Sequence, residues 1–256
     1  PYRHAAGRVA GGAGCGDERL GFLCRDSTQD DTLRLPLLEV DTNCALDRAM
    51  PKTRRARSMT QVPAILILAA GTSSRMRGSD KLLELIDGEP QLTRIARSAA
   101  QTGAQVFVTL PPDRPDRSAA LVGLNLTVLV INDASEGMAA SVRAGAVAAA
   151  SATGLMILPA DMPELDTSDL TRVIEAFGKE PSRIWRATTG DGQLGHPVIF
   201  PASAFAVLAD LIGDSGARQF LTMRRDRTGL IALPDQRAVL DLDTPEDWDN
   251  WRCKRR

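Results

Sequence analysis

The stretch from Ala64 to Leu83 constrains the fold of this chain more than any other. It reads A-I-L-I-L-A-A-G-T-S-S-R-M-R-G-S-D-K-L-L. A short run of Ile and Leu ends at a small-residue turn, which is typical of a buried parallel strand. From Gly71 to Ser74 the chain is rich in backbone N–H donors, and Arg75 and Lys81 supply two cations nearby. The sequence therefore predicts a strand that ends in a phosphate-binding loop.

Two common phosphate-binding motifs are excluded by the spacing. A P-loop reads G-x-x-x-x-G-K-[ST], but here the glycine register differs and Lys81 is followed by Leu82. A dinucleotide fingerprint reads G-x-G-x-x-G, and the second glycine is missing. The remaining interpretation is a loop that grips a nucleoside triphosphate through its amides, Arg75 and Lys81. Such a loop lets the α-phosphorus be attacked while the charge on the leaving pyrophosphate is neutralised.

The pattern L-A-A-G-x-S-S-R-M-x-G-x-x-K-L-L resembles the signature of nucleotidyltransferases related to molybdenum cofactor cytidylyltransferase, in the MobA-like NTP transferase family. The wider group includes the guanylyltransferase of the same pathway and the sugar and isoprenoid-precursor nucleotidyltransferases. Arg77 stands between Met76 and Gly78, where Met-Gly is commoner. The resemblance implies a Rossmann-like α/β fold, a Mg²⁺ cofactor and nucleotidyl transfer. An ordinary strand–turn–helix with stray basic residues remains the alternative for this stretch.

Composition excludes several other classes of protein. The chain has 256 residues, 43 % hydrophobic and 25 % charged, as in an ordinary globular protein. A net charge of −1 and an aromatic content of 4 % argue against nucleic-acid and membrane binding. We find neither a spanning apolar run nor a secretion signal, so we expect a cytoplasmic protein. The four cysteines lack metal-ligand or disulfide spacing.

The first 58 residues differ from the rest of the chain. They contain a Gly-Ala-Gly-rich patch and a basic run, and they show no sustained hydrophobic period. We interpret residues 1–58 as a disordered tail or as sequence upstream of a natural start at Met59. A basic arm for an acidic partner is the alternative. Residues 59–256 are then one nucleotidyltransferase domain.

From Ala64 onward, predicted strands alternate with predicted helices. The strands are expected at Ala64–Leu68, Gln105–Leu110, Leu126–Ile131 and Leu155–Leu158, and the helices at Leu92–Gln101 and Met138–Ala150. This alternation indicates an α/β fold with a mostly parallel sheet covered by helices on both faces. Ligands of such sheets bind beyond the carboxyl ends of the strands, so the loop after Leu68, the loop Asn132–Gly137 and Asp161 should share one rim.

The pattern loosens after Ile184. The segments Trp185–Ala187 and Gly195–Phe200, joined through Gly190-Asp191-Gly192, predict a small antiparallel addition to the sheet. Further helices are expected at Ala202–Leu211 and Ser215–Arg225, and further strands at Gly229–Leu233 and Ala238–Leu242. A last helix should begin near Pro245, with Asp243 or Thr244 as its cap.

Carboxylates in two places could hold the metal. Asp161 follows a buried strand in a tight Pro-Ala-Asp-Met-Pro turn, and nucleotidyl transfer needs a carboxylate for Mg²⁺. The resemblance also places the metal on this aspartate. A second ligand could come from L-D-L-D-T-P-E-D, where Asp243 is the first candidate and Asp241 and Asp247 remain open. A turn-capping role for Asp161 and a helix-capping role for Asp243 are the structural alternatives.

The remaining site residues are assigned by role. Arg75, Lys81 and Asp161 are the predicted catalytic residues, with Arg75 as a fork for phosphate oxygens and Lys81 as a point charge. The resemblance implies that Gly137 and Ser141 line the base and ribose, and that Gly195, His196 and Pro197 lie on the acceptor side. The predicted nucleotide-binding residues are Ala69, Ala70, Gly71, Thr72, Ser73, Ser74, Arg75, Lys81, Gly137 and Ser141.

The resemblance implies transfer of CMP from CTP to the phosphate of molybdopterin that bears molybdenum, with release of pyrophosphate. Cytidine is favoured by Ala69-Ala70-Gly71, since guanylyl relatives more often read L-A-G-G. One alternative is a GTP donor or a sugar- or polyol-phosphate acceptor on the same fold. The other is a non-catalytic carrier or chaperone of the cofactor. A molybdoenzyme or its insertion chaperone is the protein partner to expect.

Overall fold

The computed structural model describes residues 62–132, 137–213, 221–222 and 227–255, which belong to a unit that runs from Ala56 to Arg256. The interpretation of residues 1–58 falls outside these ranges, so it stays a prediction. Most of the predicted helix Ser215–Arg225 also lies outside them.

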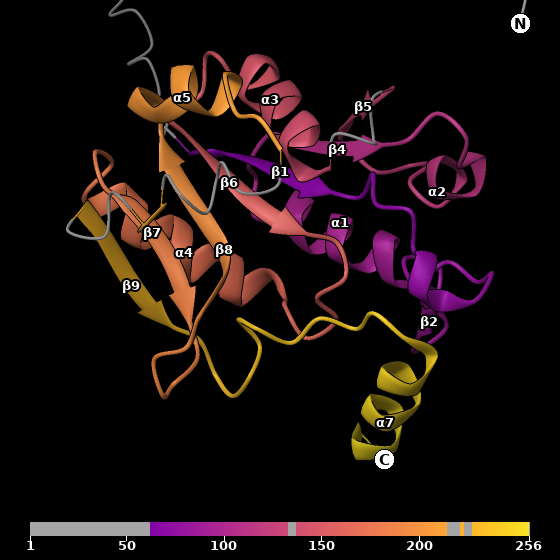
Figure 1. Cartoon of the computed structure of the whole chain (residues 1–256). Coiled ribbons are helices and arrows are strands. Elements are labelled where there is room, and N and C mark those ends of the chain that lie inside the picture. Colours follow the sequence, from indigo (N-terminus) through magenta and orange to yellow (C-terminus); the bar gives the residue numbers. More distant parts are fainter. Residues whose placement is uncertain (1–61, 133–136, 214–220, 223–226, 256) are drawn as a thin grey trace, which may run out of the picture. The chain divides into compact units, whose positions relative to one another are not determined.

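A seven-stranded sheet runs through the described residues in the order β5-β4-β1-β6-β8-β7-β9 (Figure 1). Four neighbouring strands, β5, β4, β1 and β6, are parallel, and β1 pairs on both sides, with β4 and with β6. Their bounds are β1 Ala64–Leu68, β4 Val106–Leu110, β5 Thr127–Val130 and β6 Gly154–Pro159. Each was predicted to within one or two residues from its apolar run.

The other half of the sheet changes direction at β8. This strand is antiparallel to both of its neighbours, β6 and β7, and β9 then continues parallel to β7. The bounds are β7 Ile184–Thr188, β8 Leu194–Pro201 and β9 Thr228–Ala232. A separate two-stranded hairpin joins β2 (Leu85–Ile86) to β3 (Glu89–Pro90) through Asp87 and Gly88, which both have positive φ.

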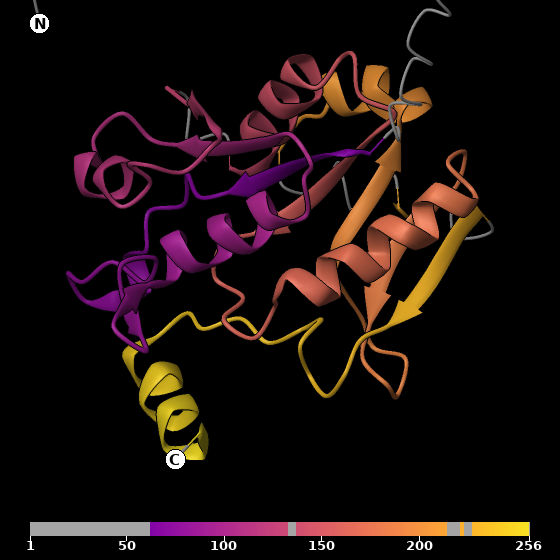
Figure 2. The same ribbon diagram turned by 180° about the vertical axis from the view of Figure 1, so that it is seen from behind.

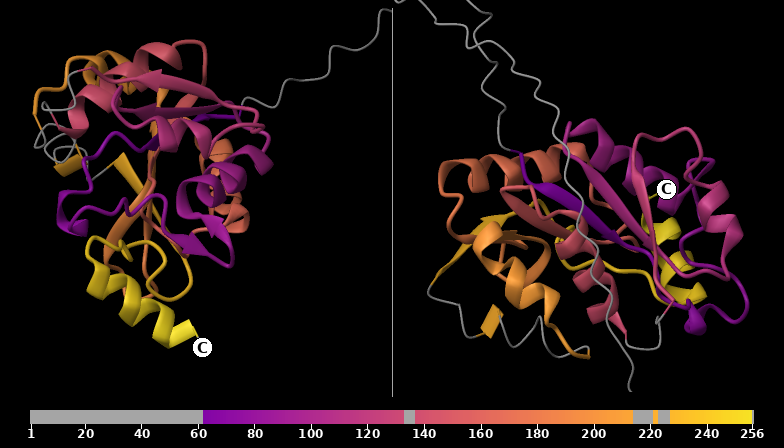
Figure 3. Two further views of the ribbon diagram at one scale, coloured as in Figure 1. Left: turned by 90° about the vertical axis from the view of Figure 1, so that its right-hand side faces the viewer. Right: turned by 90° about the horizontal axis from the view of Figure 1, so that it is seen from above.

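Helices cover both faces of the sheet. Figure 2 shows α1 and α4 on one face, and the view from above in Figure 3 places α3 and α5 on the other. The bounds are α1 Gln91–Gln101, α2 Pro115–Ala119, α3 Met138–Ala148, α4 Thr167–Lys179, α5 Phe205–Ala209 and α7 Pro245–Arg255, with short 3-10 turns η1 Ser74–Met76 and η3 Ala202–Ala204.

Alternation along β1 divides the core into two parts. Ile65 and Ile67 pack in the cluster that holds α1 and α4, whereas Ala64 and Leu66 pack in the cluster that holds α3 and α5. Each buried Ile or Leu contributes about 1.5–3 kcal/mol to folding. Because both faces are covered, the strand reads as continuously apolar in sequence. The mostly parallel α/β fold with a small antiparallel addition is therefore confirmed.

The prediction of a strand at Ala238–Leu242 is wrong. The backbone N–H groups of Val239 and Leu240 both donate to the carbonyl of Gln236, so this part of the chain turns. β9 already pairs with β7, and the segment instead reaches the end of β6, where the N–H of Leu242 donates to the carbonyl of Asp161 at 3.3 Å. Its apolar residues are buried by packing rather than by strand pairing.

Each helix in the described part of the chain is too short or too polar to cross a membrane.

Candidate active site

Lys81 lies between two carboxylates that are far away in sequence. Its Nζ atom is 2.5 Å from Oδ2 of Asp161 and 2.6 Å from Oδ1 of Asp243. On the other side of Asp243, Nη1 of Arg75 is 2.5 Å from Oδ2. The side chains of Lys81, Asp161 and Asp243 remain 16 %, 18 % and 21 % exposed, so a ligand can reach them from solvent. The predicted catalytic residues thus meet in one place.

The carboxyl end of β6 positions Asp161. Pro159 is in register with Leu68 at the end of β1, and the N–H of Ala160 donates to the carbonyl of Leu68. The fully buried Gln91, at the start of α1, donates from Nε2 to the carbonyl of Ala160 at 2.9 Å. The turn that carries Asp161 is therefore held from two sides, next to the loop after β1.

Helix α7 is capped by Thr244, so Asp243 does not serve as its cap. The N–H of Asp247 donates to Oγ1 of Thr244, and the N–H and hydroxyl of Thr244 donate to Oδ2 of Asp247. These reciprocal bonds are the arrangement of a capping box. Oδ2 of Asp247 is engaged there, whereas the carboxylate of Asp243 is directed to Lys81 and Arg75.

Asp161, Asp241 and Asp243 form an acidic cluster in which one oxygen of each lies within 4.8 Å of the others. Burial, together with the charges of Asp161 and Asp243, raises the pKa of Asp241 above its ordinary value. Burial lowers the pKa of Lys81, but Asp161 and Asp243 outweigh it and hold that pKa above its usual range. Crowded carboxylate oxygens are the donors that Mg²⁺ and Mn²⁺ prefer, so these residues fit a divalent cation.

The loop after β1 presents its backbone next to this cluster. The N–H of Ala69 donates to the hydroxyl of the buried Thr109 at 3.3 Å, which fixes the exit of β1. A Cβ atom placed on Gly71 would meet open space, so there is room for a ligand over the loop. Ser73 has a positive φ, and η1 begins directly after it. The predicted phosphate-binding residues Ala69 to Ser74 therefore lie beside Arg75 and Lys81.

Helix α3 packs near the same loop through small residues. Ala70 belongs to an apolar cluster with Ile131 and Ala140. Gly137 precedes the helix with a φ of 73°, and Ser141 is buried one turn further on. At Gly145, an added Cβ would come within 2.2 Å of Leu66 Cδ2, so a larger residue here would force the buried side chain of Leu66 on β1 to move. Of the two residues predicted to line the base and ribose, Gly137 thus precedes this helix and Ser141 lies in it.

Gly195, His196 and Pro197 lie in the first half of β8, which is antiparallel to β6 and so approaches the rim where β6 ends. An added Cβ on Gly195 would lie 1.9 Å from the carbonyl oxygen of Ala238, so only glycine fits there. Nδ1 of His196 is buried and finds no hydrogen-bond partner among the described residues. Burial and then the charge of Arg186 lower the pKa of His196 to about 4, against a smaller opposing effect of Asp161.

Sequence reasoning missed Arg117. Its side chain is fully buried and contacts Asp80, the residue directly before Lys81. The run D-R-P-D-R from Asp113 to Arg117 reads as a solvated group of charges, and nothing in its spacing sets this arginine apart. The only sequence signal was Asp80, a carboxylate inside a loop expected to bind phosphate. A lone acid in such a loop needs a cationic partner.

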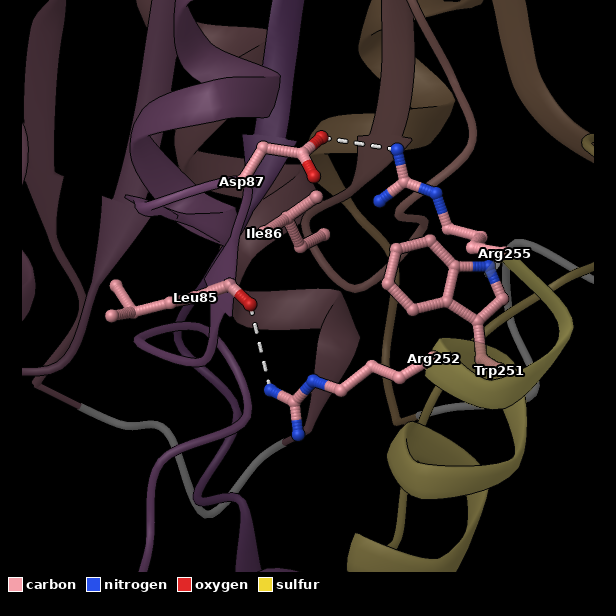
Figure 4. Close-up of a pocket in the computed structure, with 6 residues that line it drawn as sticks. All are labelled: Leu85, Ile86, Asp87, Trp251, Arg252 and Arg255. Atoms are coloured by element: carbon pink, nitrogen blue, oxygen red, sulfur yellow. Dashed lines mark hydrogen bonds and ion pairs between the residues drawn. The ribbon is translucent and has the colours of Figure 1, made fainter.

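A pocket of about 310 Å³ lies elsewhere, between the β2–β3 hairpin and α7 (Figure 4). The guanidinium groups of Arg252 and Arg255, which line this pocket, already form ion pairs with carboxylates of the protein. Arg255 is 3.0 Å from the carboxylate of Asp87, and Arg252 is 2.7 Å from that of Glu84. These contacts fasten the hairpin to α7, so we do not assign the nucleotide to this pocket.

Several known proteins are similar to this chain in sequence or in fold. A molybdenum cofactor guanylyltransferase from Burkholderia vietnamiensis is 32 % identical over 190 residues, which cover 70 % of this chain and 90 % of the relative. The nicotine blue oxidoreductase of Paenarthrobacter nicotinovorans is 27 % identical over 195 residues, 73 % of this chain and 96 % of the relative. The crystal structure of Rv0371c from Mycobacterium tuberculosis superposes with a TM-score of 0.65 at 29 % identity, covering 75 % of this chain and 98 % of that one.

The model of the MobA-like NTP transferase domain matches residues 65–228, which include the loop after β1, Lys81, Asp161 and the segment from Gly195 to Pro197. The chain belongs to the MobA-like NTP transferase family.

Proposed function

We propose that this chain transfers CMP from CTP to the phosphate of molybdopterin that bears molybdenum, and releases pyrophosphate. The observation that carries the proposal is the position of Lys81, which lies within 2.6 Å of carboxylate oxygens of both Asp161 and Asp243 beside the loop after β1. A triphosphate gripped by that loop would meet cationic and acidic groups on adjacent sides. The relatives named molybdenum cofactor guanylyltransferase support a molybdopterin acceptor.

The reaction is an in-line displacement at the α-phosphorus of the nucleotide. An oxygen of the acceptor phosphate forms the new bond, and the bond to the α–β bridging oxygen breaks, with its electron pair leaving on pyrophosphate. The acceptor is already an anion at neutral pH, so no general base is needed. Mg²⁺ held by Asp161 and Asp243, with Asp241 beside them, would supply positive charge to the α- and β-phosphate oxygens.

The protein groups hold the reactants and stabilise the charge of the leaving group. Lys81 moves its ammonium group from the carboxylates to the β- and γ-phosphate oxygens, where it stabilises the pyrophosphate. Arg75, whose side chain is 69 % exposed, leaves Asp243 and turns its guanidinium to the same oxygens. Gly137 and Ser141 line the base and ribose, and Gly195 to Pro197 face the acceptor. Holding both substrates in line supplies a large part of the rate.

Ala70 supports the choice of cytidine. Its methyl group packs with Ile131 and Ala140 in the cluster between the loop and α3. The guanylyl relatives more often have glycine at this position, and we infer that the methyl group leaves less room for a base beside the loop and favours the smaller pyrimidine ring. Ala70→Gly should therefore raise turnover with GTP relative to CTP by about tenfold, the size expected for one methyl group in a pocket. An unchanged ratio would remove this support for cytidine.

A nucleotide panel tests the proposal. The protein is mixed with Mg²⁺, molybdopterin bearing molybdenum and each of CTP, GTP, ATP and UTP, and pyrophosphate release is followed. We expect release with CTP that needs the acceptor. Release with GTP alone would favour the guanylyl alternative. Tight binding of the cofactor without any pyrophosphate release would contradict an enzyme and favour a carrier.

A further inference from the structure

Arg117 reaches the loop after β1 from the short helix α2 and uses every one of its N–H donors there. Nε donates to Oδ2 of Asp80 at 2.7 Å, and Nη2 donates to Oδ1 of Asp80 and to Oγ of Ser73. Nη1 donates to the carbonyl oxygens of Ala69 and Gly71, at 2.6 and 2.7 Å. A guanidinium has five N–H donors in a rigid fork, and the five bonds above use all of them. The side chain can therefore be fully buried without an unpaired donor.

The two carbonyl contacts fix the orientation of two peptide groups. Within the described residues, the only cis peptide bond joins His196 to Pro197, so the loop peptides are trans. In a trans peptide, the C=O of one residue and the N–H of the next point in opposite directions. Because the carbonyls of Ala69 and Gly71 point to the guanidinium, the N–H groups of Ala70 and Thr72 point away from it.

A second arginine extends the same pattern by one residue. Nη2 of Arg114 donates to the carbonyl of Thr72 at 3.1 Å, so the N–H of Ser73 is also turned away from its arginine. Within the described part of the chain, the N–H groups of Ala70, Thr72 and Ser73 make no hydrogen bond of their own. These three donors are available for an anion.

Asp80 connects this arrangement to Lys81. Its carboxylate accepts hydrogen bonds from the guanidinium of Arg117, the hydroxyl of Ser73 and the N–H of Leu82. These bonds connect the residues on both sides of Lys81 to the loop after β1. The bonds with Arg117 help to hold the pKa of Asp80 below its ordinary value despite burial. One buried guanidinium thus sets both the direction of the loop amides and the place from which Lys81 extends.

We propose that Arg117 is a positioning residue for the phosphate chain of the nucleotide. It contacts the carbonyl side of the loop and thereby directs the N–H groups of Ala70, Thr72 and Ser73 to the phosphates, while it does not contact the nucleotide itself. The proposal rests on the proposed function, since it assumes that a nucleoside triphosphate binds at this loop. It predicts that a substitution of Arg117 lowers the affinity for a nucleotide more, the more phosphates that nucleotide carries.

The test measures the affinities of CTP, CDP and CMP, each with Mg²⁺, by titration calorimetry. In the unaltered protein, affinity should rise with each phosphate. Arg117→Lys keeps the charge but cannot span both carbonyls and Asp80, so CTP affinity should fall about ten- to hundredfold while CMP affinity changes much less. Adding methylguanidinium to Arg117→Ala should restore part of the CTP affinity.

Two further variants keep the test informative. Arg114→Ala removes the exposed contact to Thr72 and a longer ion pair with Asp80, at 4.0 Å, but leaves Arg117 in place. It should fold normally, with a loss of CTP affinity of about twofold to fivefold. Arg237→Lys is the control, because Arg237 is likewise an arginine with two simultaneous contacts, to Asp166 and Asp169 at the start of α4, but lies outside the loop. It should cost thermal stability without changing the ratio of CTP to CMP affinity.

The outcomes separate the two claims. If the unaltered protein binds no nucleoside triphosphate, the proposed function itself fails. If it binds CTP but Arg117→Lys and Arg114→Ala keep the normal ratio of CTP to CMP affinity, the positioning role is overturned. An equal loss for CTP and CMP in Arg117→Lys would also overturn it, because it would indicate general damage to the fold.

Discussion

Asp80 and Lys81 are neighbours in the chain, yet they belong to two different networks. The arginine network consists of Arg117, Asp80, Ser73 and the carbonyls of Ala69 and Gly71. The carboxylate network consists of Lys81, Arg75, Asp161, Asp241 and Asp243. The first is closed, with Arg117 unexposed and Asp80 only 8 % exposed. The second is open to solvent.

The charge balance of the two networks also differs. Arg117 and Asp80 cancel, and all donors of the guanidinium are used. In the carboxylate network, three carboxylates face two cations, which leaves an excess of one negative charge when all are ionised. A closed and neutral network supports the loop, whereas an open and acidic one is suited to exchanging its cations for a metal and a substrate. Removing a carboxylate should therefore cost mainly stability in the first network and mainly activity in the second.

Asp161→Asn should have the largest effect on activity and little on stability. It removes the central carboxylate, so turnover should fall about a thousandfold or more. It also removes one of the charges that raise the pKa of Asp241, so the melting temperature should stay the same or rise. Pyrophosphate release and thermal unfolding measure the two effects. If Asp161→Asn lowered the melting temperature as much as Asp80→Asn does, the proposed difference between the two networks would be wrong.

Lys81→Met should lower turnover by about a hundredfold to a thousandfold, because the leaving pyrophosphate loses its point charge. Asp161 and Asp243 would then lose the ammonium group between them, and the fold should be destabilised. Adding Mg²⁺ should restore the melting temperature more in this variant than in the unaltered protein. An equal response of both proteins to Mg²⁺ would count against a metal at these carboxylates.

Asp80→Asn should destabilise the protein by about 3 kcal/mol, since it leaves a buried guanidinium without its anion. Urea denaturation at neutral pH measures the change. Asp166→Asn, at an exposed arginine contact on α4, is the comparison and should cost less. If both variants lose the same free energy of unfolding, the buried Arg117–Asp80 pair contributes no more to stability than the exposed contact does, and the prediction is wrong.

His196 should give the smallest effect, a dependence of stability on pH. Its pKa is about 4 in the folded protein and about 6.5 when exposed, so the unfolded chain takes up the proton first. The contribution of His196 to the free energy of unfolding should therefore be greatest above pH 6.5 and decrease towards pH 4. The decrease should be about 1–2 kcal/mol for a partly exposed ring. As the pH is lowered from 7.5 to 4.5, the urea midpoint of the unaltered protein should approach that of His196→Asn, which lacks this titrating group. Parallel curves would contradict this.

The parallel half of the sheet could be predicted from sequence because its information is local. Apolar runs such as Ala64–Leu68, each followed by small or polar residues, indicate both a strand and the rim where it ends. That rim brings Asp161 to Lys81 across 80 residues of chain. The mostly parallel fold and the proximity of these two residues followed from it.

The remaining features depend on contacts that the sequence does not encode locally. Ala238–Leu242 has the apolar character of a strand, but β9 already pairs with β7 and the segment reaches the end of β6. Asp243 and Thr244 are equally good caps in sequence, and only the bonds between Thr244 and Asp247 separate them. Arg117 reads as a surface charge because its partners, Asp80 and the loop carbonyls, are distant in the chain.

A crystal structure with Mg²⁺ and a CTP analogue whose α–β bridging oxygen is replaced by carbon tests the account most directly. We expect the phosphates on the N–H groups of Ala70, Thr72 and Ser73, with Lys81 on the β- and γ-phosphate oxygens and the metal on Asp161. A triphosphate bound elsewhere, for example at Arg252 and Arg255 beside α7, with Lys81 still between Asp161 and Asp243, would contradict it.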